Sequence, residues 1–254
     1  MQKDPIQSLF IGSKQFRLPS CHSTNAVASD LLAESNPAEG TVIITDNQTA
    51  GRGQRGNEWE SQPGKNLTLS IILKPGFLPV SQQFDLTVVS SLALTNTLLD
   101  IGMSNPLIKW PNDIYYNGSK IAGILIENTV RSNRLEWTIL GIGLNVNQSG
   151  FITAGATSIK RELKEEVNLD RVLKKLLRRL NEYYGFLKAG HFQKLRAMYM
   201  EQLMWLNEQR TFHNIALNTT FSGVIQKVTA EGKLIIATDN QHLVLDFKEV
   251  TFLG

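Results

Sequence analysis

The sequence predicts an α+β fold: a mixed sheet packed with helices, followed by a small C-terminal β-barrel. Two runs of β-branched and leucine residues, 41–46 and 67–73, are typical of buried strands. Apolar residues at helical spacing over 84–101 predict a long buried helix. After about Leu206 the pattern changes to short alternating runs separated by Gly and Asn. We therefore expect two domains, residues 1–206 and residues 207–254.

The first elements place a polar loop between two strands. Residues 23–35 are predicted to form a helix whose start is capped by Ser23 or Thr24. The strand at 41–46 follows, and the next strand begins at residue 67. The residues between these strands are rich in Gly and Arg, so we expect a long loop there.

The middle of the chain is predicted to complete the sheet. The helix over 84–101 stops at Gly102, where a left-handed C-cap is expected. An Asn117-Gly118 pair between apolar runs is the strongest short-range signal for a β-hairpin. We expect strands at residues 107–110, on both sides of this pair within 115–126, and at 135–146.

The C-terminal part begins with an amphipathic helix. Its apolar stripe consists of Leu173, Leu176, Leu177, Leu180, Tyr184 and Leu187. The opposite face carries Lys174, Lys175, Arg178 and Arg179, for which a solvated face is favoured over a nucleic-acid patch. Short strands are then expected at residues 211–217, 221–228, 234–238 and 242–247.

The composition excludes several classes of protein. The 254 residues are 42% hydrophobic and 19% charged, which is typical of a globular protein and not of a disordered chain. The net charge of +3 is too small to indicate a nucleic-acid partner. There is one cysteine, Cys21, and neither an apolar leader nor a membrane-length apolar run is present. We therefore expect a cytoplasmic protein that does not span a membrane.

Three glycines, Gly51, Gly53 and Gly56, formally match the G-x-G-x-x-G fingerprint of dinucleotide-binding proteins. That fingerprint requires a helix that opens at the glycines, so that its N-terminus meets the pyrophosphate. Here residues 57–65 are loop-like and the next element is a strand. The context therefore argues against a dinucleotide site.

The same segment, residues 50–56, is suited to binding an anion; we refer to it as the GRG loop. Glycine permits close approach of the backbone, and the guanidinium groups of Arg52 and Arg55 offer paired donors to a carboxylate or phosphate. Trp59 adds an indole just beyond the loop. For the segment taken alone, an ordinary surface loop with two solvated arginines remains the alternative.

Two further segments carry lysines. The KWPND segment, residues 109–113, ends a strand in a turn whose backbone angle Pro111 sets. Lys120 begins the apolar run 121–126, where its ammonium either lies at the sheet edge or projects into a cleft. Taken singly, the KWPND segment could be only a turn, and for Lys120 the position at the sheet edge is favoured over the cleft.

The segment 141–147 alternates small and apolar residues and ends in two asparagines. Small residues allow a flat ligand to lie against the backbone. Asn145 and Asn147 are candidates to hydrogen-bond a nucleotide or a metal-bound water. Capping of a strand end is the alternative role for both asparagines.

Taken in chain order, these segments resemble the motif series of biotin-protein ligases. The series comprises Ser23-Thr24-Asn25, Gln48 with the GRG loop, the KWPND segment, Lys120 with the run that follows it, and the segment 141–147. The order is more specific than any single motif, and the resemblance covers the chain from about residue 20 to its end. It implies a class II synthetase-like catalytic domain followed by a small SH3-like domain.

The resemblance also implies an activity. Biotin-protein ligases make biotinyl-5'-adenylate from biotin and ATP, and then pass the biotinyl group to a lysine of a carboxylase's biotin-carrier domain. Because the first step brings a carboxylate to a phosphate, positioned cations and a divalent metal supply most of the catalysis. Arg52 and Lys120 are the expected catalytic cations. Mg²⁺ is expected only with the phosphates of ATP, because the four histidines lack ligand spacing.

The residues expected to bind biotin and ATP follow from the same resemblance. Ser23, Thr24 and Gln48 would hydrogen-bond the ureido ring of biotin. The pocket wall against its apolar bicycle would consist of Gly123, Leu125 and Gly141. Because water destroys a mixed anhydride, the GRG loop is expected to fold over the adenylate. The full set is Ser23, Thr24, Asn25, Gln48, Gly51, Arg52, Gly53, Gln54, Arg55, Trp59, Lys109, Asn112, Lys120, Gly123, Leu125, Gly141, Gly143 and Asn145.

One residue of the GRG loop departs from the family pattern. Gln54 stands where many biotin-protein ligases have an arginine. Glutamine keeps hydrogen-bonding groups but loses a charge. We therefore expect the adenylate to be held less tightly, or by other residues.

Other functions stay open at this point. A lipoate or octanoate ligase or transferase shares the fold class, and a non-catalytic adaptor would use the C-terminal domain. Only 22 residues precede Ser23, too few for the DNA-binding domain that some biotin ligases carry, so neither a repressor nor a nucleic-acid partner is expected. The sequence leaves open whether the chain forms a homodimer.

Overall fold

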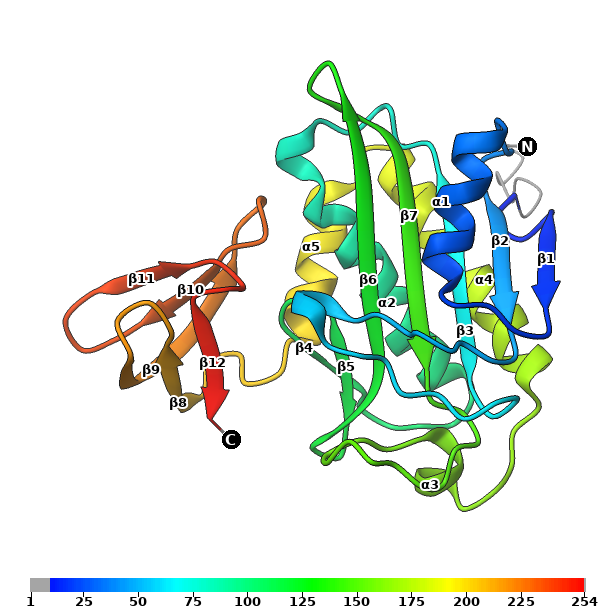
Figure 1. Cartoon of the computed structure of the whole chain (residues 1–254). Helices are drawn as coiled ribbons and strands as arrows, with labels where there is room; N and C mark the ends of the chain where they lie inside the picture. Colours follow the sequence, from blue (N-terminus) through cyan, green and yellow to red (C-terminus); the bar gives the residue numbers. More distant parts are fainter. Residues whose placement is uncertain (1–9, 254) are drawn as a thin grey trace, which may run out of the picture.

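The larger of the two sheets in the structure has seven strands. The computed structural model describes residues 10–253, apart from the side chain of residue 55. The strand order is β1-β2-β3-β7-β6-β5-β4, in which β1 and β2 are parallel and the other neighbours are antiparallel (Figure 1). The strands are β1 (Gln15–Leu18), β2 (Thr41–Thr45), β3 (Leu67–Leu73), β4 (Leu107–Lys109), β5 (Asp113–Tyr116), β6 (Ser119–Arg131) and β7 (Arg134–Leu144).

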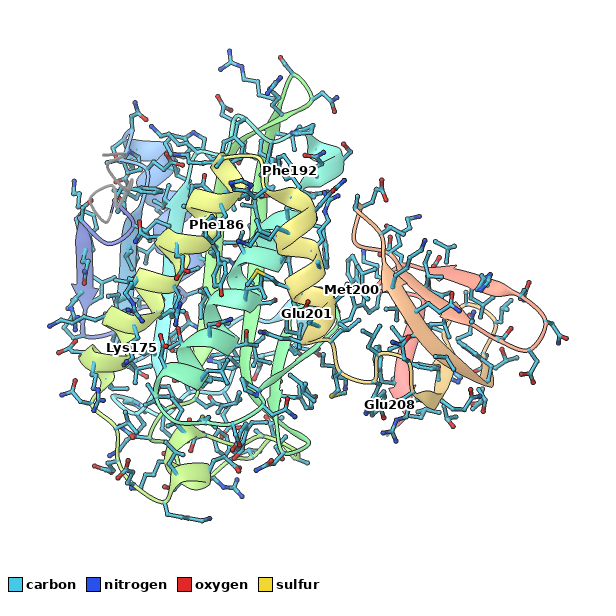
Figure 2. All side chains as sticks on the ribbon, turned by 180° about the vertical axis from the view of Figure 1, so that it is seen from behind. Lys175, Phe186, Phe192, Met200, Glu201 and Glu208 are labelled. Carbon is cyan, nitrogen blue, oxygen red and sulfur yellow. The ribbon has the colours of Figure 1, made fainter. Side chains whose placement is uncertain are left out.

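Helices cover both faces of this sheet. One face packs against α1 (Thr24–Glu34), and the other is covered by α2 (Phe84–Asp100), α4 (Leu169–Lys188) and α5 (Phe192–Glu201). Figure 2, the view from behind, shows α4 with Lys175 and Phe186, and α5 with Phe192 and Met200. Because both faces are covered, all seven residues of β3 are buried, as its continuous apolar run predicts. The predicted α+β class is confirmed. A short helix, α3 (Ile159–Leu163), follows β7.

Several local predictions are confirmed. Asn117 and Gly118 form the turn between β5 and β6, with φ values of 48° and 77°. Helix α2 ends at Asp100, and Gly102 follows it with a φ of 97°, as expected for a left-handed C-cap. All six residues of the predicted stripe on α4 are buried.

Other local predictions are wrong. Ser23 occupies the N-cap position of α1, but its side chain makes no capping hydrogen bond; Gln48 Oε1 accepts the backbone N–H of Thr24 instead, at 2.9 Å. The strand predicted at 211–217 ends at Asn214, because a turn follows in which Asn214 Oδ1 accepts the N–H of Leu217. The sequence does not predict β1, a half-buried edge strand, or the short helix α5.

The buried apolar residues of the C-terminal sheet belong to the same cluster as the core of the larger sheet. The strand order of the C-terminal sheet is β11-β10-β9-β8-β12, with all neighbours antiparallel. Phe212, Ile225 and Leu234 are fully buried within it. Trp110 joins it to the rest of the chain, because its Nε1–H donates to the carbonyl of Gly232 at 2.9 Å. The strands are β8 (Gln209–Asn214), β9 (Thr219–Val228), β10 (Leu234–Ala237), β11 (His242–Leu245) and β12 (Val250–Leu253).

Candidate active site

The sheet face that packs against α1 carries small and polar residues near its centre. In β7, Gly141 and Gly143 alternate with buried Ile142, and a β-carbon on Gly141 would meet Asn25 of α1. The glycines therefore face α1, and the side chain of Ile142 between them points to the opposite face of the sheet. Ser70 of β3 pairs with Gly141 and extends this small and polar surface. The sheet consequently leaves open space beside the start of α1.

A cavity of about 260 Å³ lies over this face of the sheet. Apart from Gly51, Asn145 and Arg55, whose side chain the structure does not describe, all of the predicted site residues line it. Its walls come from the start of α1, the loop between β2 and β3, the strands β3, β6 and β7, the KWPND segment and strand β12. The structure thus brings together motifs from both ends of the chain.

Buried polar side chains form one end of the cavity. Ser23, Thr24 and Asn25 are each at most 5% exposed. A backbone bridge before α1 brings Gln48 to the start of the helix, where it accepts the Thr24 N–H. The hydroxyl of Ser70 lies 2.7 Å from Thr24 Oγ1 and 2.6 Å from Asn25 Oδ1. This cluster holds donors and acceptors in position for a polar ring.

Trp59 closes the cavity from the loop between β2 and β3. Its indole lies so close to Gly143 that a β-carbon at this position would collide with the ring, and it lies 3.2 Å from the β-carbon position of Gly123. The Nε1–H of Trp59 is buried, and it has no hydrogen-bond partner among the residues that the structure describes. Because buried donors without acceptors are rare, this N–H is a candidate donor to a bound molecule.

The two predicted catalytic cations both line the cavity, and each faces a carboxylate. Lys120 Nζ lies 2.7 Å from Asp113 Oδ1, and Arg52 Nη2 lies 3.5 Å from Glu127 Oε1. Glu127 also accepts from Asn25 Nδ2 at 2.6 Å, so it links the GRG loop to α1. Both cations are therefore available to an anion bound in the cavity.

Lys109 is a third cation at the same end. Its Nζ lies 3.4 Å from the hydroxyl of Tyr115, 4.9 Å from the centre of the Tyr115 ring and 5.5 Å from that of Phe252. Burial lowers the pKa of the Lys109 ammonium, and the charge of Lys120 adds to this effect, while Asp113 opposes it. Burial likewise raises the pKa of the Tyr115 hydroxyl.

Three predicted site residues are not among those that line the cavity. Gly51 accepts the N–H of Trp59 at 3.0 Å and so shapes the loop. Asn145 is buried and donates to the carbonyl of Thr157 at 3.0 Å, which matches the structural alternative for this asparagine. The side chain of Arg55 lies outside what the structure describes.

The sequence also missed residues that line or support the cavity. Glu127 occurs in no motif of the series, and its role depends on the register between β6 and β7. The C-terminal sheet contributes a further wall, for which no sequence signal exists, through Phe247, Val250, Thr251 and Phe252.

The arrangement suits one kind of chemistry. The cavity combines a polar pocket, glycine and aliphatic residues, and the cations Arg52, Lys109 and Lys120. Such a site fits a carboxylic acid on a largely apolar body that reacts with a phosphate. The fold and the site therefore define an acid-activating enzyme.

Comparisons with known proteins agree with this class. The model of the biotin/lipoate A/B protein ligase family matches residues 18–145. The chain is 31% identical to the biotin--[acetyl-CoA-carboxylase] ligase of Paracoccus denitrificans, over 91% of this chain and 98% of that protein. It is also 31% identical to the bifunctional ligase/repressor BirA of Bacillus subtilis, over 85% of this chain and 67% of that protein.

A solved structure shares the fold over nearly the whole chain. The biotin protein ligase of Aquifex aeolicus, in complex with biotin and ATP, matches with a TM-score of 0.78 at 26% identity. The match covers 94% of this chain and 98% of that chain. The protein belongs to the biotin/lipoate A/B protein ligase family, so the resemblance inferred from its motifs is confirmed.

Proposed function

We propose that this protein is a biotin-protein ligase: it joins biotin to ATP as biotinyl-5'-adenylate and transfers the biotinyl group to a lysine of a carboxylase's biotin-carrier domain. The proposal is carried by one observation. The polar cluster at Ser23, Thr24 and Gln48 and the cations Arg52 and Lys120 line one continuous cavity. A cavity with these two kinds of group suits a molecule that carries both a polar ring and a reacting carboxylate.

In the first step, some residues of the cavity bind biotin and others stabilise the charge that develops. The Thr24 hydroxyl and the buried polar groups around it bind the ureido ring, and the glycine-lined slot accepts the apolar bicycle. When the biotin carboxylate attacks the α-phosphate, negative charge accumulates on the phosphorus oxygens and on the leaving pyrophosphate. Arg52 and Lys120, which both line the cavity, stabilise that charge.

Trp59 contributes to shielding the adenylate from water. Its ring already covers the slot over Gly143, and its buried N–H lacks an acceptor among the described residues. We expect this N–H to bind an oxygen of the ligand. The glycines of the GRG loop permit closure over the reacting atoms.

A divalent ion would bind at this site together with the phosphates of ATP. Within residues 10–253, no group of three or more His, Cys, Asp or Glu side chains is placed to hold a metal ion. Mg²⁺ commonly binds through one or two carboxylates together with substrate phosphates. Asp113 is the cavity carboxylate that lies beside Lys120 and is placed to assist. The ion, when bound with ATP, supplies neutralisation of phosphate charge.

The proposal also covers the location of the protein in the cell, its partners and its domains. No helix in the described part of the chain has the length and apolar character needed to cross a membrane. We place the protein in the cytoplasm, without a nucleic-acid partner, and we divide it at residues 206 and 207. A homodimer remains a prediction that the sequence alone leaves open.

The experiment determines whether biotin or another acid, such as lipoate or octanoate, is the substrate. Biotin-dependent exchange of pyrophosphate into ATP, and biotin transfer to a carrier domain, are measured for the parent, Arg52→Ala and Lys120→Ala. Loss of one transition-state cation is expected to lower the exchange rate by roughly 100-fold or more. Exchange that depends on lipoate or octanoate and not on biotin would overturn the proposal. Full activity in both variants would overturn the assignment of the two cations.

A further inference from the structure

Glu127 of β6 lies outside the cavity, but its carboxylate contacts two residues that line it. One oxygen, Oε2, accepts a hydrogen bond from Asn25 Nδ2 at 2.6 Å. The other, Oε1, lies 3.5 Å from Arg52 Nη2. Asn25 and Arg52 belong to the cavity wall, whereas Glu127 does not. Glu127 therefore acts on a bound molecule only through its neighbours.

A chain of short hydrogen bonds leads from Glu127 to Thr24. From Asn25 the contacts continue to Ser70, whose Oγ lies 2.6 Å from Asn25 Oδ1 and 2.7 Å from Thr24 Oγ1. Asn25 and Thr24 are each 3% exposed, and Ser70 is fully buried. Gly141 makes room for the chain, since a β-carbon there would lie 2.5 Å from Asn25 Oδ1. Because the chain is buried, each polar atom depends on its neighbours for hydrogen bonds.

The chemistry of these groups allows one direction for the hydrogens along the chain. An ionised carboxylate only accepts, so Asn25 must turn its NH2 group to Glu127 and its oxygen to Ser70. That oxygen also only accepts, so Ser70 must give it the single hydrogen of its hydroxyl. The Ser70 oxygen is then the acceptor for the Thr24 hydroxyl hydrogen. Thr24 therefore has lone pairs, and no hydrogen, to offer a molecule in the cavity.

Gln48 is the other polar group beside the Thr24 hydroxyl, and it does not disturb this direction. Its Oε1 accepts the backbone N–H of Thr24 at 2.9 Å but lies 3.4 Å from Thr24 Oγ1. Hydrogen bonds between a hydroxyl and an oxygen are commonly about 2.7–2.8 Å long. Ser70 is therefore the better acceptor for the hydroxyl hydrogen, while Gln48 holds the backbone.

We propose that Glu127 is a positioning residue that sets the hydrogen-bond polarity of the pocket: through Asn25 and Ser70, it makes the Thr24 hydroxyl an acceptor for an N–H group of the ligand. This inference rests on the proposed function, and it names the group that selects the ring of biotin. The ureido ring carries two N–H donors, whereas octanoate and the dithiolane ring of lipoate carry none. The polarity set by Glu127 therefore favours biotin over lipoate and octanoate.

Exchange of the carboxylate for an amide removes the fixed direction. In Glu127→Gln, the side chain presents either an oxygen or an NH2 group to Asn25, and the Asn25 amide can turn over to match. In the turned state Asn25 donates to Ser70 and Ser70 donates to Thr24. The Thr24 hydrogen is then free to point into the cavity. The pocket of this variant therefore accommodates an acceptor as well as a donor.

The experiment compares biotin with two analogues of nearly the same shape. In each cyclic carbamate analogue, one of the two ureido N–H groups is replaced by an oxygen atom, which cannot donate. The affinity of each compound is measured by calorimetric titration without ATP, for the parent, Glu127→Gln and Glu136→Gln. Glu136 is the matched control, because its side chain is 38% exposed and pairs with Arg131, much as that of Glu127 is 41% exposed and faces Arg52. Glu136 does not line the cavity.

The parent and Glu136→Gln should bind biotin about 100-fold or more tightly than the analogue that lacks the N–H facing Thr24, because two oxygens would meet there without a hydrogen. In Glu127→Gln this preference should fall to about tenfold or less, since the Thr24 hydrogen can turn to the analogue. A general loss of packing would weaken all three compounds alike and leave the preference unchanged. An unchanged preference in Glu127→Gln would overturn the inference. Absence of biotin binding by the parent would instead overturn the proposed function.

Two further variants separate the chain of hydrogen bonds from the charge of Arg52. Arg52→Ala removes the cation but leaves the chain intact, so the preference for biotin over the analogue should stay at the parent value. Ser70→Ala interrupts the chain beyond Asn25 and should lower the preference as Glu127→Gln does. The double variant of Glu127 and Ser70 should lower it no further, because both changes break one chain. A lower preference in Arg52→Ala, or additive losses in the double variant, would also overturn the inference.

Discussion

The indole ring of Trp59 occupies the space that a β-carbon on Gly143 would need. The ring reaches this position because Gly123 pairs with Gly143 on the adjacent strand and also lacks a side chain. The loop between β2 and β3 can therefore lie flat on the sheet at the cavity. Glycine at position 143 is required here for packing and not for an unusual backbone angle.

Gly143→Ala is expected to displace Trp59 from the slot. The new methyl group would collide with the indole, which must move outward together with its loop. We expect biotin affinity to fall by about tenfold or more, since roughly 1.4 kcal/mol of lost contact corresponds to this factor. Calorimetric titration with biotin measures the change.

Gly185→Ala is the matched control for that substitution. Gly185 lies within α4, and a β-carbon there would contact nothing within 4 Å. Alanine in a helix interior should stabilise the fold by about 0.5–1 kcal/mol. Biotin affinity should be unchanged in this variant. Equal affinity in Gly143→Ala would contradict the role given to Trp59.

Gln48→Leu is expected to destabilise the start of α1. The backbone N–H of Thr24 would lose its acceptor in a place where Thr24 is 3% exposed. An unsatisfied buried donor costs about 1–3 kcal/mol, which urea unfolding would detect. Gln48→Glu keeps an acceptor oxygen, and a negative charge is favourable at a helix N-terminus. If the leucine and glutamate variants unfold at the same urea concentration, the cap does not stabilise the protein.

Gln54→Arg should hold the adenylate more tightly than the parent. Gln54 lines the cavity, so an arginine there would place another cation within reach of phosphate. Release of radiolabelled adenylate from the purified complex should be slower in this variant. Gln54→Met, which adds no charge, serves as the comparison. Equal release from Gln54→Arg and the parent would show that other residues already supply the missing contact.

Asp100 links the C-terminal end of α2 to the middle of α4, and its loss should be visible in the stability of the fold. Its carboxylate accepts hydrogen bonds from Arg179 (2.7 and 2.9 Å) and Arg178 (2.8 Å). These contacts, with Arg179 the larger influence, hold the pKa of Asp100 below its ordinary value of 3.8. Because the carboxylate retains some exposure, we expect Asp100→Asn to cost about 1–2 kcal/mol at pH 7.

The sign of the pH dependence follows from the lowered pKa. The stabilisation is fully present above the unfolded value of 3.8 and is lost as the pH falls through the lower folded pKa. The difference between parent and Asp100→Asn should therefore shrink in acid. Asp170→Asn is the control, since its pair with Arg17 is more than half exposed and should change stability by less than about 0.5 kcal/mol. A constant difference across this pH range would contradict the assignment.

These arginines also show where a sequence pattern is ambiguous. The basic face of α4 is compatible with a solvated face or with a nucleic-acid patch. In the fold, Arg178 and Arg179 bind a carboxylate on α2. Asp100 lies far from both arginines in the chain, and no local spacing connects them. Only packing of α2 against α4 reveals the pair.

The candidate active site likewise has features that the sequence indicates and features that only the fold decides. The alternation of Gly141, Ile142 and Gly143 is visible in the sequence, because residues in a strand point to opposite faces in turn. The order of the motifs likewise indicates a cavity with Arg52 and Lys120. The partners of these cations, Glu127 and Asp113, depend on how β5, β6 and β7 are aligned with each other and with α1.

The sequence by itself determined the fold class, most of the strands and helices, and the set of residues that gather around one cavity. Periodicity and turn chemistry act over a few residues, so they leave a readable local pattern. Only the tertiary structure decided that Gln48 caps α1, that Trp59 rests on Gly143 and that Phe252 lines the cavity. Each of these contacts joins segments that come together only when the fold is complete, because packing depends on shape and no local pattern encodes it.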